Sequence, residues 1–141
     1  MANGQAIADA ARLLVGTPYH HQGRKAGVGL DCIGVPILAA RAAGLDVHDF
    51  AAYGPMPVPE VLLDEIAKDC DKVEPSDMRT GDILCFKSGF THPSHFGVLL
   101  GDMPERKFVH AYNKLDRVNV QILDDRWLRL LHSVWRVKGV R

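Results

Sequence analysis

The sequence has no excess of either charge, since 17 Lys and Arg residues balance 17 Asp and Glu residues. Proteins that bind nucleic acid or anionic membranes usually carry a clear basic surplus, so the balance disfavours both classes of partner. No apolar run approaches the length of a membrane span, and the first residues lack the basic and apolar segments of a secretion signal. We therefore expect no membrane insertion, no signal peptide, and a cytoplasmic location during synthesis.

Cysteine is also scarce in this sequence. The chain has three, Cys32, Cys70 and Cys85, with no pair at C-x-x-C spacing. An odd, widely spaced set argues against both a disulfide framework and a zinc ribbon, and favours reduced thiols. The remaining composition, with 47% hydrophobic and 24% charged residues, is that of an ordinary globular protein. Its length of 141 residues suits a single domain that occupies residues 1–141.

The first half of the chain has the periodicity of helices. Apolar residues recur at helical spacing in 5–15, where Asn3 is the expected N-cap. The next helix is expected to begin at an Asp31 N-cap and to end at Gly44. This assignment places Cys32 at a helix N-terminus.

The second half of the chain has the periodicity of strands. Before the strands begin, a third helix is expected after a proline-rich connector at 53–59, with Cys70 in its apolar face.

Strands are expected in the rest of the chain, because from residue 81 onward the apolar period changes to two. The expected strands are 83–86, which contains Cys85, then 96–100, 107–112, 118–122 and 133–137. Helices followed by antiparallel strands, with a meander as the simplest order, indicate the α+β class.

Cys32 has the clearest potential for chemistry. The thiolate is the nucleophilic form of cysteine, and the N–H groups of a helix N-terminus can lower a thiol pKa and hold an oxyanion. The neighbouring Asp31 opposes this effect, because a carboxylate disfavours a second negative charge. The plainer interpretation makes Cys32 a small buried apolar residue, and its position alone leaves both interpretations open.

Two histidines could supply a base and an orienting partner. Alternation puts His95 and His110 on one face if their two strands form a hairpin. A four-residue loop sets the histidines directly opposite each other, and a six-residue loop makes them diagonal neighbours. Nucleophile, base and orienting group together are typical of thiol acyl chemistry, although seven histidines also permit a chance juxtaposition. A zinc site from Cys32 and the same two histidines is chemically conceivable, but no ligand pair has the usual spacing.

Five short motifs occur in order: GTPY at 16–19, GLDCIG at 29–34, GDIL at 81–84, HFGVLLG at 95–101 and FVHA at 108–111. Together they resemble the NlpC/P60 family of papain-like cell-wall peptidases, and the match runs from about residue 5 to the end of the chain. The first two motifs and their surroundings are most similar to the branch found in phage tail genes and gene transfer agents. The resemblance implies a papain-like α+β fold, with N-terminal helices packed on an antiparallel sheet.

The resemblance also implies a role for each site residue. Cys32 would be the nucleophile, His95 the general base and acid, and His110 the orienting third member of a Cys-His-His triad. Tyr19 would lie near the oxyanion, and Asp31 would contact the substrate. The family needs no metal or cofactor.

The implied activity is that of a cysteine endopeptidase which hydrolyses amide bonds in peptidoglycan stem peptides, with the γ-D-glutamyl to diamino-acid bond as the leading candidate. Ile33 stands where the family usually has serine, which removes a hydroxyl from the expected substrate pocket. Other phage tail-tip proteins are the expected partners, and the virion or a tail-like particle is the expected destination. The rival interpretations are a tail-tip assembly module with little or no catalysis, and acyl transfer by the same thiol.

Overall fold

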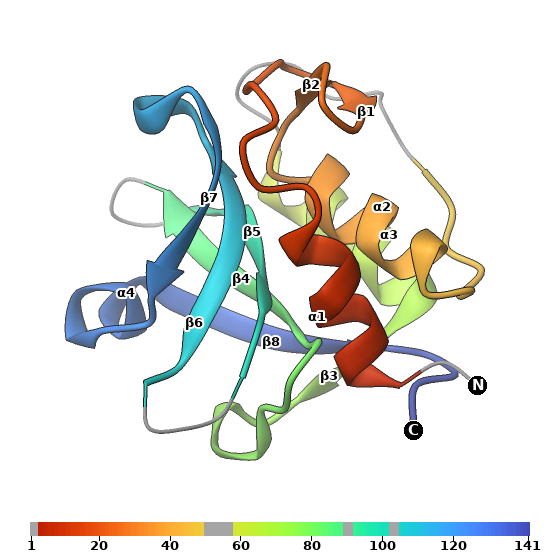
Figure 1. Ribbon diagram of the computed structural model, residues 1–141. Helices are drawn as coiled ribbons and strands as arrows, with labels where there is room; N and C mark the ends of the chain where they lie inside the picture. Colours follow the sequence, from red (N-terminus) through yellow and green to blue (C-terminus); the bar gives the residue numbers. More distant parts are fainter. Residues whose placement is uncertain (1–2, 50–57, 89–91, 102–104) are drawn as a thin grey trace.

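The computed structural model describes residues 3–49, 58–88, 92–101 and 105–141. The helices in these ranges are α1 Gly4–Arg12, α2 Gly34–Ala42, α3 Pro59–Asp69 and α4 Asp125–Leu130 (Figure 1). The strands are β1 Arg24–Lys25, β2 Gly29–Leu30, β3 Cys70–Val73, β4 Ile83–Ser88, β5 His92–Leu99, β6 Lys107–Tyr112, β7 Arg117–Ile122 and β8 Leu131–Val137. Of the expected proline-rich connector, residues 53–57 lie outside the described ranges.

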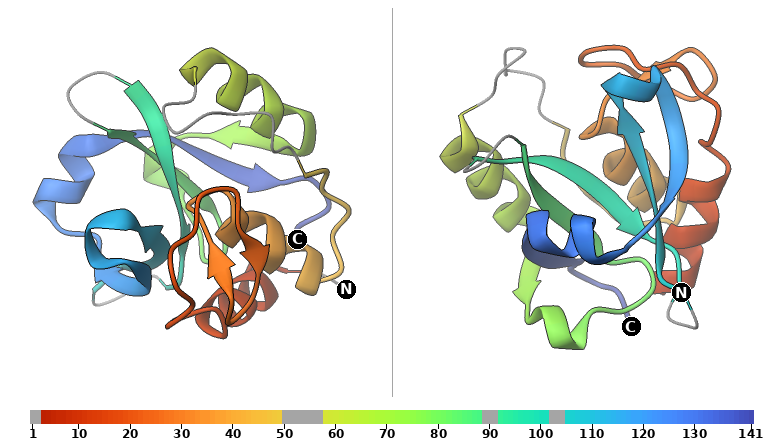
Figure 2. Two further views of the ribbon diagram at one scale, coloured as in Figure 1. Left: turned by 90° about the horizontal axis from the view of Figure 1, so that it is seen from above. Right: turned by 90° about the vertical axis from the view of Figure 1, so that its left-hand side faces the viewer.

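A six-stranded antiparallel sheet organises the molecule, in the order β3-β8-β4-β5-β6-β7. Helices α1, α2 and α3 lie on one side of this sheet and α4 lies on the other (Figure 1; Figure 2, right). The buried apolar side chains accordingly form two clusters, one beneath the three helices and one around Trp127 of α4. Because alternate residues of a strand face opposite sides, Phe96 joins the first cluster while Leu99 joins the second.

The structure confirms the α+β class and most of the expected elements. Helix α1 begins at the predicted cap, where the Asn3 side chain accepts a hydrogen bond from the N–H of Ala6 at 2.9 Å. The four strands β4 to β7 follow one another as the predicted meander. Cys85 is fully buried in β4, as expected of a strand core residue.

Two expectations about the sheet are wrong. The last strand does not extend the meander beyond β7, because β8 returns to the far side and pairs with both β3 and β4. Cys70 is not in a helix face: α3 ends at Asp69, and Cys70 has the extended backbone with which β3 begins. Both differences have one cause, which is the pairing of β3 with β8. The backbone of Cys70 and the residues after it bonds to β8, a strand more than 60 residues later in the sequence, in place of continuing the helix. No helix in the described part of the chain is long and apolar enough to cross a membrane.

Candidate active site

Cys32 lies in the turn that opens α2. The Asp31 side chain accepts hydrogen bonds from the N–H groups of Ile33 at 3.1 Å and Gly34 at 2.8 Å. The Asp31 carbonyl accepts a third from the N–H of Val35 at 3.4 Å. The regular helix is assigned from Gly34, but Asp31 performs the capping that its position predicts. Cys32 therefore sits in the first, capped turn.

The Asp31 carboxylate is buried, with 2% of its surface exposed, and fully engaged. Besides capping the helix, it forms an ion pair with Arg24 at 2.8 Å and accepts a hydrogen bond from the N–H of Gln22 at 2.9 Å. Arg24 in turn forms an ion pair with Asp49 at 2.9 Å. The resemblance implies that Asp31 contacts substrate, which stays a prediction; in this structure its contacts hold the carboxylate against the start of α2 and Arg24. We assign it to holding the Cys32 turn.

The Cys32 thiol lies where two strands separate. The pairing of β5 with β6 ends at Val98 and Val109. In an antiparallel ladder alternate residues turn their backbone groups toward the partner, so Ser94 and Phe96 point theirs into the gap that follows. The Cys32 Sγ donates a hydrogen bond to the carbonyl of Ser94 at 3.6 Å, one residue from His95.

Cys32 is a neutral thiol at rest. Burial raises its pKa to about 12, Asp31 raises it further, and the backbone N–H groups of Phe96 and of Cys32 itself only partly oppose the rise. Backbone N–H groups can lower a thiol pKa, as the helix start suggests, but in the resting structure the cost of desolvating a thiolate exceeds what two N–H groups return. The opposition expected from Asp31 has the predicted sign. Deprotonation requires a nearby base.

His95 and His110 meet across β5 and β6. His95 Nε2 lies 2.7 Å from His110 Nδ1. The pairing of Val98 with Val109 makes the histidines diagonal neighbours, which is the arrangement expected of the longer of the two loops. The prediction that they share a face is confirmed.

Gly97 makes this contact possible, and the sequence analysis gave it no role. Gly97 lies one residue beyond the last β5–β6 pair, and a Cβ atom here would lie 2.8 Å from the Phe108 ring and 3.5 Å from the His110 Cβ. A side chain at 97 would therefore push the histidine face apart. Glycine inside a strand often marks such a close approach, which is the sequence signal that could have identified it.

Both site histidines are neutral near pH 7. Burial lowers the pKa of His95 to about 4. Burial, with a smaller contribution from His95, lowers that of His110 to about 3, and only Asn119 opposes the change. Because His95 Nε2 lies against His110, Nδ1 is the ring nitrogen of His95 that this contact leaves unused. Cys32 contacts the same strand at the carbonyl of Ser94, one residue before His95.

Tyr19 lies between the end of β2 and the start of β7. Burial, followed by Cys32 and Asp31, raises its pKa to about 12, so the phenol keeps its proton. Its backbone is held by a hydrogen bond from the Tyr19 N–H to the carbonyl of Asp116 at 2.8 Å. A protonated hydroxyl near Cys32 can donate to an oxyanion formed there.

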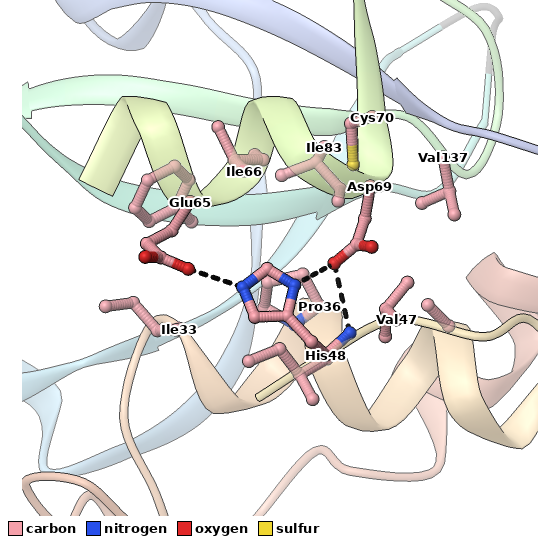
Figure 3. Close-up of a pocket in the computed structure, with 13 residues that line it drawn as sticks. Ile33, Pro36, Val47, His48, Glu65, Ile66, Asp69, Cys70, Ile83 and Val137 are labelled. Atoms are coloured by element: carbon pink, nitrogen blue, oxygen red, sulfur yellow. Dashed lines mark hydrogen bonds and ion pairs between the residues drawn. The ribbon is translucent and has the colours of Figure 1, made fainter. Parts of the chain in front are cut away.

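Ile33 lines a largely apolar pocket between α2 and α3 (Figure 3). Its side chain is 4% exposed and belongs to the helix-side core. His48 crosses this pocket between two carboxylates, with Nε2 at 2.5 Å from Glu65 and Nδ1 at 2.5 Å from Asp69. Apolar side chains of this pocket, such as those of Ile37 and Ile66, surround Ile33. An isoleucine side chain therefore packs where the family usually has the hydroxyl of a serine.

No group of three His, Cys, Asp or Glu side chains in the described ranges is arranged to hold a metal ion. The groups that this site offers for chemistry are the thiol, the two imidazoles and the neighbouring hydrogen-bond donors.

Comparison with known proteins places this geometry in context. The sequence model of the NlpC/P60 family matches residues 16–136. The NlpC/p60 domain of the peptidoglycan hydrolase SagA has a TM-score of 0.66 and 24% identity, over 96% of this chain and 99% of that one. An NLP/P60 family protein described as similar to lipoprotein, from Staphylococcus aureus, has a TM-score of 0.68 and 21% identity, over 98% of this chain and 41% of that one.

A NlpC/P60 family protein from Bacillus cereus has a TM-score of 0.70 and 17% identity, over 95% of this chain and 40% of that one. The chain thus spans less than half the length of the Staphylococcus and Bacillus proteins, but nearly all of the SagA domain. No curated protein sequence matches the chain. These similarities agree with the papain-like fold that the sequence motifs imply.

Proposed function

Since the chain belongs to the NlpC/P60 family, we propose that it is a cysteine endopeptidase which hydrolyses amide bonds in peptidoglycan stem peptides. The observation that carries the proposal is the 2.7 Å contact between His95 Nε2 and His110 Nδ1, together with the Cys32 thiol that donates to the carbonyl of Ser94, the residue before His95. The similar SagA domain comes from a peptidoglycan hydrolase, which supports the same class of substrate. The γ-D-glutamyl to diamino-acid bond is our preferred target.

Attack on the amide is coupled to proton transfer. Cys32 holds its proton at rest and His95 is an unprotonated base, so the proton moves from Sγ to His95 Nδ1 as sulfur bonds to the amide carbon. Asp31 occupies the N–H groups of Ile33 and Gly34. The donors we assign to the oxyanion are therefore the N–H of Cys32 and the Tyr19 hydroxyl.

Collapse and hydrolysis complete the cycle. The protonated His95 gives its proton to the leaving amine as the carbon–nitrogen bond breaks, which leaves a thioester on Cys32. His95 then takes a proton from water, whose oxygen attacks the thioester carbon and releases the new carboxyl group. The proton returns to the sulfur, and His110 keeps the His95 ring oriented throughout.

Digestion of purified sacculi in water enriched in ¹⁸O tests this function. Wild-type protein should release fragments whose new carboxyl group carries ¹⁸O, whereas Cys32→Ala should release none, because no thioester can form. Cys70→Ala is the matched control, since Cys70 is a buried thiol in β3. Fragments lacking ¹⁸O would indicate acyl transfer, and equal release by Cys32→Ala would refute the proposed nucleophile.

We further propose that the protein acts from a phage tail or tail-like particle, with other tail-tip proteins as partners. The support is the similarity of the motifs at 16–34 to that branch of the family. Proteomics of purified particles should find the protein among the tail components. Its presence in lysate but never in particles would refute this role.

A tail-tip assembly module without catalysis is the second candidate function. It is favoured by the raised pKa of Cys32 and the lowered pKa of His95, which leave the resting site without a thiolate–imidazolium pair. The module alone predicts that particles carrying Cys32→Ala assemble and penetrate the cell wall as wild-type particles do. A penetration defect in particles that assemble normally would exclude it.

A further inference from the structure

One nitrogen of the site is left without a partner. His110 is 0% exposed, and its Nε2 atom has no hydrogen-bond partner among the described residues. Leaving a buried polar atom without a hydrogen bond costs free energy, and this cost can decide which of the two ring nitrogens carries the hydrogen. The question is which neighbour this nitrogen can use.

Asn119 is the cross-strand neighbour of His110. The two residues pair directly in the β6–β7 ladder, so their side chains project from the same face, with Cβ atoms about 4.5 to 5.5 Å apart. The Asn119 Nδ2 donates to the carbonyl of Arg117 at 3.1 Å, and Oδ1 accepts from Gln121 at 3.3 Å. An amide oxygen accepts two hydrogen bonds, so Oδ1 retains one position.

Asn119 also influences the charge state of His110. Burial and His95 lower the pKa of His110, and the Asn119 side chain raises it. The resting geometry nevertheless falls short of a full hydrogen bond to Nε2. Hydrogen bonds in catalytic groups are often long before substrate binds and shorten in the complex.

The proton positions of the proposed mechanism demand an acceptor here. His95 can take the Cys32 proton on Nδ1 only if its Nε2 carries hydrogen and donates to His110. His110 Nδ1 must then accept, which puts the hydrogen of this neutral ring on Nε2, where it needs an acceptor of its own. The sheet register sets Asn119 directly opposite His110, and its Oδ1 is an acceptor with one position left.

We propose that Asn119 is a positioning residue of this site, which accepts from His110 Nε2 and thereby fixes the tautomers of His110 and His95. The role in catalysis rests on the proposed function, but the tautomer does not. The resulting chain of hydrogen bonds runs from Asn119 through His110 to His95, with Cys32 at its end.

Trp127 is the competing neighbour. Its ring lies 5.2 Å from that of His110 at 89°, and its Nε1 atom also lacks a partner among the described residues. Because indole can only donate, a bond from Trp127 would make His110 Nε2 an acceptor and select the opposite tautomer. The two neighbours therefore predict different positions for one hydrogen atom.

Nitrogen-15 NMR of the histidine rings at neutral pH distinguishes the two without any substrate. In the wild type, we expect His110 Nε2 to carry hydrogen and Nδ1 to be bare. Asn119→Leu removes the acceptor, so a substantial population should move its hydrogen to Nδ1. Asn119→Asp keeps an acceptor and should keep the wild-type tautomer, while Trp127→Phe should leave it unchanged.

The same variants give a kinetic readout on a stem-peptide substrate. Asn119→Leu should lower kcat by about ten- to hundredfold, the factor that corresponds to an unpaired buried donor, with KM unchanged, and Asn119→Asp should recover most of the loss. A bare His110 Nε2 in the wild type, or an unchanged tautomer in folded Asn119→Leu, would overturn the proposal. Asn119→Leu could fail to fold, and the other two variants then decide. A His110 tautomer that shifts in Trp127→Phe would overturn the proposal. A hydrogen that stays on His110 Nε2 in both Trp127→Phe and Asn119→Asp would support it. Absence of sacculus digestion with the expected tautomers would refute the proposed function alone.

Discussion

Two histidine clusters in this chain lie in opposite electrostatic surroundings. His95 and His110 are enclosed by aromatic rings, including those of Phe86 and Trp127, and burial lowers the pKa of both. His48 lies between Glu65 and Asp69, whose hydrogen bonds raise its pKa, and it is 36% exposed (Figure 3). The first pair is neutral near pH 7, and the raised pKa of His48 favours its charged form.

The difference assigns a different task to each cluster. A neutral imidazole can accept a proton, so the ring-enclosed pair is suited to act as a base. A charged imidazole between two carboxylates cannot, but it can hold segments together, and His48 fixes the chain after α2 to α3. The same type of side chain therefore has a lowered pKa in one cluster and a raised pKa in the other because of what surrounds it.

Replacing the histidines of the two clusters should give the largest difference in turnover. His95→Ala should lower turnover of a stem peptide by about 10²- to 10⁴-fold, the usual contribution of a general base. His110→Asn should retain part of the activity, because an amide oxygen can still accept a hydrogen bond from the His95 ring. His48→Gln is the matched control and should retain wild-type turnover. Steady-state kinetics on folded variants would contradict the roles if His110→Asn were as inactive as His95→Ala.

The pH profile separates the clusters next. His95 must be unprotonated to accept the Cys32 proton, so kcat/KM should stay level down to its pKa of about 4 and then fall about tenfold per pH unit. Circular dichroism at each pH has to accompany the rates. The folded protein holds His95 and His110 neutral, whereas the unfolded chain protonates its histidines below pH 6.5. The free energy of unfolding should therefore fall as the pH drops from 6.5 toward the lowered pKa values of the two residues. An acid limb centred near 6.5 in folded protein would contradict a desolvated base.

Gly97 provides a way to disturb the ring-enclosed pair alone. Gly97→Ala places a Cβ atom 2.8 Å from Phe108, so we expect about 1–3 kcal/mol of destabilisation and a displaced His110. Gly101→Ala is the control, because a Cβ atom there meets nothing within 4 Å. Urea unfolding measures both effects. Equal stability of the two variants would show that the close approach at Gly97 is not required.

The smallest effect is expected at His48. Its raised pKa means that the ion pairs stabilise the fold fully below pH 6.5 and that this contribution is lost as pH rises through the folded pKa. Because solvent screens a side chain that is 36% exposed, His48→Gln should cost at most about 1 kcal/mol near pH 6 and nothing in alkaline buffer. Urea unfolding in the two buffers measures this. A cost that grows with pH would have the wrong sign.

Local sequence pattern predicts much of this arrangement. Alternation places His95 and His110 on one face once their two strands form a hairpin, and their contact at 2.7 Å agrees with that prediction. Side-chain caps are equally local, so Asn3 and Asp31 are identified from their own neighbours.

The remaining features depend on segments distant in the sequence. The raised pKa of Cys32 arises mainly from burial by the assembled core. The sequence around Asp31 and Cys32 does not show this burial. Arg24 neutralises Asp31 only after the β1–β2 segment folds over the start of α2. The enclosure of His110 needs Trp127 from α4, an element that the sequence analysis did not predict.

The most direct test of the account is the mass of the protein during turnover. Acid quenching within a few turnovers, followed by peptide mapping, should find the acyl part of a stem peptide attached to Cys32 and absent from Cys70 and Cys85. His95→Ala should show no such adduct, because its thiol keeps the proton, whereas His48→Gln should show it as the wild type does. Release of product by the wild type without an adduct on Cys32, at a rate that Cys32→Ala matches, would contradict a thiol mechanism at this site.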